Sequence, residues 1–144
     1  MANTLEVKIV NGMLAYSALT SLLATAPDGA AAIFEMQEYQ GTTFPAITYM
    51  LVSAVPQYSS TTRLATLPCR VQFTIWANDP ETARSVETQL LAWIDQFNAY
   101  DPTNAAKPRQ PNEIVMRRQG GNPQTQPLTY WRIVDANIWN NESF

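Results

Sequence analysis

The sequence predicts an α+β fold: an antiparallel or mixed sheet of four to five strands packed by two helices, in the order α-β-β-α-β-β. Two segments carry apolar residues at spacings of three and four, which is typical of helices. Four segments alternate apolar and polar residues or are continuously apolar between turn residues, which indicates strands. Because the links between consecutive strands are short and polar, we expect antiparallel pairing and helices layered on the sheet.

A chain of 144 residues corresponds to one domain, 1–144, and is long enough to bury a core without a disulfide or a metal. Hydrophobic residues make up 46% of the chain and charged residues 15%, so the composition is globular with a thinly charged surface. We expect residues 140–144 to form a short C-terminal arm.

The first helix is expected from residue 3 to about residue 25. Gly12 in its middle costs up to ~1 kcal/mol relative to alanine, so we expect it to mark a close approach of another element. The apolar stripe of this helix consists of Leu5, Ile9, Met13, Tyr16, Leu19 and Leu23.

The second helix is expected from Pro80 to about Asn98. Asp79 is placed to cap it, Pro80 takes the first helical position, and Glu81 lies where negative charge meets the positive end of the helix dipole. Its apolar face consists of Ala83, Val86, Leu90, Ile94 and Phe97, with Trp93 beside it.

Strands are expected at residues 46–55, 69–77, 113–118 and 128–139. The first is apolar on both faces, which implies that both are covered. In the second, Val71, Phe73 and Ile75 point to the core, and the alternate residues form a polar face. Residues 30–38 stay open between helix and strand, and residues 57–68, 100–112 and 119–127 are expected to be connections.

Three details concern the last two strands. Ile114 and Met116 are expected to point inward, and Gly120 and Gly121 to form a turn. Trp131 is expected in the core under a helix, whereas Trp139 is expected in a docking arm.

The residue types that are missing exclude several classes of enzyme. There is no histidine, which removes Ser-His-Asp and Cys-His catalysis and histidine-bound metals, and one cysteine cannot form a metal cluster. Cys69 and the neighbouring carboxylates (Glu35 with Glu38, Asp95 with Asp101) are best explained as a structural thiol and surface charges. We therefore expect no enzyme and no cofactor.

Charge and hydropathy bear on partners. A net charge of −3 argues against a dedicated nucleic-acid binder, and no apolar run approaches the ~20 residues of a membrane span. The first ten residues lack the features of a signal peptide. A basic cluster is a candidate partner surface, although passing nucleic acid or an ordinary solvated strand end would explain it as well: Lys107, Arg109, Arg117, Arg118 and Arg132.

Two segments and the helix after them carry a resemblance to a known family. The run Phe44-Pro45-Ala46-Ile47-Thr48-Tyr49 enters a strand, and Arg70-Val71-Gln72-Phe73-Thr74-Ile75-Trp76-Ala77 forms the next one before the capped helix. This pattern, over roughly residues 5–139, resembles the tail-terminator (tail-completion) proteins of long-tailed bacteriophages.

The resemblance implies a structural virion protein located between tail and head and assembled in the host cytoplasm. Such proteins form a hexameric ring that ends the tail tube and offers a docking surface to the head connector, while DNA passes through the lumen. The implied partners are other copies of the chain, the tail tube protein and the connector protein, with no membrane. Alternatives are another neck or connector ring subunit, a tail-tube subunit, or a small enzyme or ligand-binding domain that uses Asp95, Asp101 or Glu35.

A closed ring joins one patch to a different patch on the next copy. We expect Arg117 and Arg118 to meet acidic residues on the helix of the neighbour. The expected interface residues are Arg63, Arg109, Arg117, Arg118, Glu81, Glu87, Trp139 and Phe144.

Overall fold

The computed structural model describes residues 5–25, 29–35, 44–54, 66–97, 112–122 and 129–141. In chain order these form α1 (Leu5–Leu14), α2 (Ser17–Thr20), β1 (Ile33–Glu35), β2 (Ala46–Ala54), β3 (Thr66–Ala77), α3 (Pro80–Gln96), β4 (Glu113–Asn122) and β5 (Thr129–Asn141). The five strands make one mixed sheet in the order β1-β2-β3-β5-β4. The predicted α+β class and a mixed sheet of this size are confirmed. The short elements α2 and β1 add to the six that the sequence suggested.

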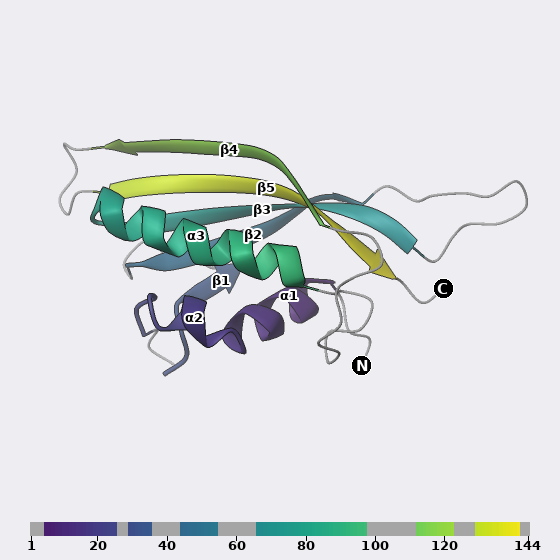
Figure 1. The fold of residues 1–144 in the computed structure, drawn as a ribbon, viewed down its shortest axis with the longest axis horizontal. Coiled ribbons are helices and arrows are strands. Elements are labelled where there is room, and N and C mark those ends of the chain that lie inside the picture. Colours follow the sequence, from purple (N-terminus) through teal and green to yellow (C-terminus); the bar gives the residue numbers. More distant parts are fainter. Residues whose placement is uncertain are drawn as a thin grey trace, which may run out of the picture.

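The three helices lie on one side of the sheet, so the sheet has a helix-covered face and an opposite face, which we call the open face (Figure 1). β1 pairs with β2 in parallel, and every other neighbouring pair is antiparallel. The expected alternation in β3 is confirmed, since Val71, Phe73 and Ile75 are buried against the helices. Alternate residues of the partner strands fill the same layer: Ile47, Tyr49, Val134, Ala136 and Ile138.

α3 is the central helix of the packed layer. The Asp79 carboxylate accepts hydrogen bonds from the backbone N–H groups of Glu81 and Thr82, as the sequence predicted. Trp93, only 1% exposed, meets the edge of the Phe73 ring at a centroid distance of 6.0 Å. An offset or edge-to-face aromatic contact adds ~0.5–1.5 kcal/mol to the burial of its area.

Asn112 ends α3. Its side-chain amide donates hydrogen bonds of 2.8 Å to the carbonyl oxygens of Ile94 and Phe97. These carbonyls belong to the last turn, which has no helical N–H groups left to bind. Asn112 is 8% exposed, and its side-chain oxygen Oδ1 accepts a hydrogen bond from the backbone N–H of Trp139 in β5 at 3.4 Å.

The N-terminal segment differs from the single helix expected up to residue 25. α1 ends at Leu14, Tyr16 takes an extended conformation, and the four-residue α2 follows. The break lets Leu19 return to the core, where it is fully buried. Gly12 does mark a close approach, because a Cβ at this position would lie 3.0 Å from the ring of Phe97, just after α3, and 3.2 Å from the Trp93 indole of α3.

Some strand boundaries differ from those that the sequence predicted. β3 begins at Thr66, so the expected connection 57–68 ends earlier than predicted, and its residues 57–65 lie outside the described part of the chain. The segment left open, 30–38, contains the short strand β1.

β4 runs through the expected turn at Gly120 and Gly121 up to Asn122. The cross-strand neighbour explains why. A Cβ on Gly120 would clash with the indole of Trp131, which stands opposite Gly120 in β5. The indole covers the bare backbone of the glycine, an arrangement that stabilises glycine in an edge strand.

Candidate interaction surface

A buried carboxylate ties α3 to the two strands at one edge of the sheet. Glu87 is 3% exposed, and its Oε1 accepts a hydrogen bond from Arg132 of β5 at 3.0 Å and another from Arg117 of β4. The side chain of Arg117 is 52% exposed and that of Arg132 is 17% exposed. Since an unpaired buried charge is costly, two arginines on one carboxylate hold the strands against the helix.

This arrangement changes the interface that the sequence suggested. We expected Arg117 to meet Glu87 on a neighbouring copy, but the two residues pair within one chain, so Glu87 is not available to a neighbour. The expected basic cluster is also divided. Arg117 lies on the helix-covered face, whereas Arg118 points to the open face, because consecutive strand residues point to opposite sides of a sheet.

Two of the expected interface residues are exposed and form no ion pair with any described residue. Glu81 is exposed in the first turn of α3, and Arg118 is exposed on β4. Trp139 is half-buried near the end of β5. Arg63, Arg109 and Phe144 lie outside the described residues, as do Lys107, Glu38 and Asp101.

The open face carries aromatic side chains at the end of the sheet where β3 finishes and β5 begins. Trp76 donates a hydrogen bond from its indole nitrogen to Thr48 at 3.1 Å, and Trp131 stands opposite Trp76 in the neighbouring strand. Trp131 was expected in the core under a helix, but it is half-buried on the face without helices. The sequence could not choose between the faces because β5 carries large side chains on both.

The far half of β2 contradicts the expectation that both its faces are covered. Met50 is 38% exposed and Val52 is 46% exposed. Leu51, which stands opposite the buried Val71 on the helix-covered side, is also 36% exposed, and a β-bulge lies between Leu51 and Ser53. The far half of β2 is therefore accessible from both sides.

An ion pair joins β3 and β5 on the open face. Arg70 of β3 donates a hydrogen bond to Asp135 of β5 at 3.0 Å. Asp135 is 3% exposed, and its Oδ1 atom is buried without a hydrogen-bond partner, as is the Nε atom of Arg70. The predicted polar face of β3 is therefore a mixed one, with an ion pair at Arg70 and an indole at Trp76, six residues farther along the strand.

The edge strand β4 adds more apolar surface. Ile114, Val115 and Met116 are 36%, 44% and 46% exposed. The prediction that Met116 points inward is wrong, because Met116 stands opposite Asp135 on the open face, whereas Ile114 stands opposite the buried Ala136 on the helix-covered side without being buried itself. A β-bulge between Ile114 and Met116 breaks the alternation, and the strand lies at the margin of the sheet. Exposed apolar residues on an edge strand are typical of a surface that contacts another protein.

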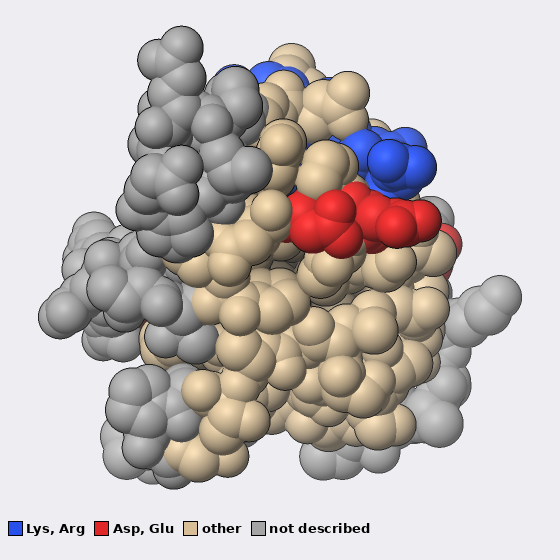
Figure 2. Space-filling model, turned by 90° about the vertical axis from the view of Figure 1, so that its left-hand side faces the viewer, with Lys and Arg blue, Asp and Glu red and all other residues tan. Residues whose placement is uncertain are grey.

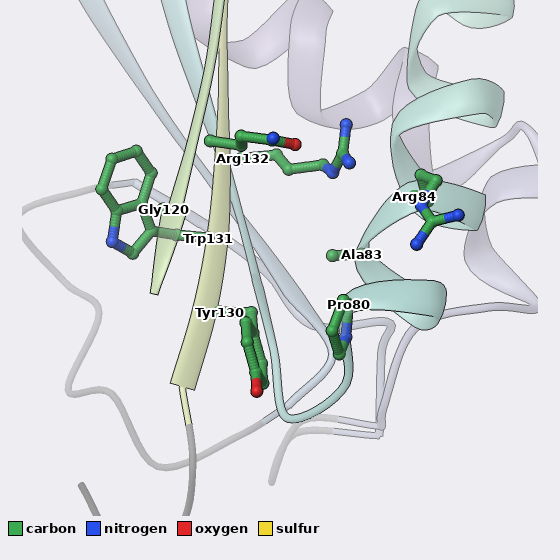
Figure 3. Close-up of a pocket in the computed structure, with 8 residues that line it drawn as sticks. Pro80, Ala83, Arg84, Gly120, Tyr130, Trp131 and Arg132 are labelled. Carbon is green, nitrogen blue, oxygen red and sulfur yellow. The ribbon is translucent and has the colours of Figure 1, made fainter. Parts of the chain in front are cut away.

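One cavity lies at the end of the molecule where α3 begins. It has a volume of about 570 Å³ between the first turns of α3 and the ends of β4 and β5 (Figure 3). Arg132 reaches from β5 toward α3, while the Trp131 indole points away on the other side of the strands. The lining residues are Pro80, Ala83, Arg84, Gln119, Gly120, Tyr130, Trp131 and Arg132.

The remaining candidates for chemistry lie apart from this cavity. Cys69 is buried in β3, Glu35 is half-buried in β1, and Asp95 is exposed near the end of α3. Among the described residues no group of three histidine, cysteine or acidic side chains could hold a metal ion.

Comparison with known proteins does not assign the chain to a family. No family model matches the chain, and no curated protein matches it at a significant level. Within the described residues, none of the helices is long and apolar enough to cross a membrane.

Proposed function

We propose that this chain is a structural subunit that assembles into the ring which ends a phage tail tube and joins it to the head connector. The observation that carries the proposal is the open face of the sheet together with its β4 edge. Met50 of β2 and Met116 of β4 are exposed on the open face, and further exposed apolar side chains lie at the bulges of the same strands: Val52, Ile114 and Val115. Exposed apolar side chains that lie next to one another on a surface mark sites where another protein binds.

The two strands that carry the family resemblance support this reading. They are β2 and β3, which pair in antiparallel register from Ala46 opposite Trp76 to Ala54 opposite Cys69. One side of these strands builds the core with α3, and the other side contributes to the open face.

A ring requires a contact between two different patches. Since Glu87 is occupied within the chain, we propose that Arg118 on the open side of β4 meets Glu81 at the start of α3 in the next copy. Both side chains are exposed, and neither has an ion-pair partner among the described residues. An exposed pair of this kind contributes ~0.2–1 kcal/mol, so it selects the register of the contact and the apolar residues supply most of its stability.

A charge-exchange experiment tests this contact. Arg118→Glu and Glu81→Arg are made singly and together, and particle mass is measured by mass photometry over a range of concentrations. Each single variant should raise the concentration at which rings form, and the double variant should lower it again. Asp95→Arg, which reverses an exposed charge at the other end of α3, is the matched control and should behave like the wild type. If the double variant assembles no better than the singles, this pairing is wrong.

Electron microscopy separates the ring from its alternatives. A tail-tube subunit polymerises into tubes by itself, whereas a terminator stays a single ring or a monomer until it meets a tube end. Incubation with purified tail tubes should place the chain at one end of each tube. A head-side connector subunit would bind the head vertex and leave the tube ends bare.

A further inference from the structure

We propose that the cavity at the start of α3 binds a short segment of a partner protein that presents a carboxylate beside an apolar side chain. The site is separate from the open face, because it opens between α3 and the helix-covered side of β4 and β5 (Figure 3). The inference goes beyond ring assembly and does not depend on it.

The size of the cavity suits a few side chains of a peptide. Its volume of about 570 Å³ falls within the range of ~300–1,000 Å³ that binding pockets occupy. Ala83 contributes only a methyl group on the helix side, and the chain places no bulky aliphatic side chain on the opposite wall, where Gln119 and Tyr130 stand. The space therefore stays open between two rigid elements.

The charge of the lining selects an anion. Two of the lining residues are arginines, and none is acidic. Arg132 is committed to Glu87, whereas Arg84 is exposed and forms no ion pair with any described residue. A guanidinium presents parallel N–H donors that match a carboxylate, so Arg84 is the group that a carboxylate would bind.

The uncharged lining residues indicate which side chain the ligand carries next to its carboxylate. Pro80 offers an apolar ring, Ala83 a methyl group and Tyr130 an aromatic ring with a hydroxyl, which together suit an aliphatic or aromatic side chain. The amide of Gln119 can donate to or accept from the backbone of an extended segment.

The surroundings favour a peptide over a nucleic acid. The chain carries a net charge of −3, and acidic side chains adjoin the basic ones on this end of the molecule (Figure 2). A polyanion would bring many phosphates against these carboxylates, whereas a segment with one carboxylate meets Arg84 alone. Much of the same end shows no charged side chains, which is compatible with contact to a neutral protein surface.

The test uses the full chain and two acetylated, amidated tripeptides, Leu-Asp-Leu and Leu-Asn-Leu. Saturation-transfer difference NMR is recorded below and above the concentration at which rings form, because Glu81 of the proposed ring contact adjoins Pro80 of the lining. The result below that concentration tests the cavity independently of the ring proposal. We expect Leu-Asp-Leu to bind about tenfold more tightly than Leu-Asn-Leu, as a charge-assisted hydrogen bond requires. Arg84→Ala should remove this preference, and Asp95→Asn, which removes an exposed charge at the other end of α3, should keep it.

Three results would overturn the inference. The two peptides could bind equally, Arg84→Ala could bind Leu-Asp-Leu as the wild type does, or neither peptide could bind at millimolar concentration. A short oligothymidylate is titrated in parallel. If it binds more tightly than Leu-Asp-Leu and displaces it, the cavity serves nucleic acid and the peptide assignment is wrong. Thermal unfolding of Arg84→Ala at the wild-type temperature confirms that the variant is folded.

Discussion

Replacing Glu87 by glutamine should destabilise the fold more than any other charge-removing substitution on α3. The glutamine keeps the size of the side chain but removes the charge that two arginines share on one oxygen. A hydrogen bond to a charged group contributes ~1.5–3 kcal/mol. The bond to Arg132 is mostly buried, so it should contribute nearly this full amount to the free energy of unfolding. The bond to the half-exposed Arg117 should contribute less than ~1 kcal/mol. We therefore expect a loss of about 2–4 kcal/mol in the free energy of unfolding.

Urea denaturation followed by tryptophan fluorescence measures this loss, since the fully buried Trp93 reports on the packing of α3. The midpoint should fall with an unchanged slope, which identifies a change in stability alone. Asp95→Asn is the matched control because Asp95 is exposed on the same helix. Its free energy of unfolding should stay within ~0.5 kcal/mol of the wild-type value. Arg132→Ala should cost more than Arg117→Ala. A loss below ~0.5 kcal/mol for Glu87→Gln, or the reverse order of the two arginines, would refute the reasoning.

Three further substitutions test the packing, each by urea denaturation. Gly120→Val should cost ~1–3 kcal/mol through its clash with Trp131, and less in a Trp131→Ala background, whereas equal costs in both would contradict the stacking. Gly12→Val should cost ~1–3 kcal/mol because its side chain meets the Phe97 ring, and a neutral outcome would mean that α1 and α3 are not in contact there. Asn112→Ala should cost ~1–3 kcal/mol by leaving the last carbonyls of α3 unpaired, unless those carbonyls reach water, in which case the loss would vanish.

Local patterns in the sequence predicted much of the sheet and the central helix. The cap at Asp79 depends only on neighbouring residues, and the alternation of Val71, Phe73 and Ile75 reflects burial of one strand face, so both could be predicted. Gly12 was also interpretable, because a glycine inside a helix costs stability and therefore suggests a close contact.

The features that the sequence missed depend on residues far apart in the chain. Glu87 looks like an ordinary exposed residue on α3 until β4 and β5 bring Arg117 and Arg132 onto it. Gly120 looks like part of a turn until Trp131 is placed opposite it. The role of Asn112 gave no local signal, since the carbonyls that it binds lie 15 and 18 residues earlier.

The exposure of the open face was missed for a different reason. Apolar residues on both sides of a strand normally mean that both sides are covered within the chain. The same pattern arises when the second side is covered by another molecule, and a single sequence does not distinguish the two cases. The exposure of Met50 therefore became informative only once the helices were placed on the other face.

The mass of the purified chain, measured with and without tail tubes, tests the central proposal most directly. We expect a monomer or one closed ring in solution, and capture of that ring at the ends of added tubes. A chain that stays monomeric at every concentration and leaves the tubes unoccupied would contradict it.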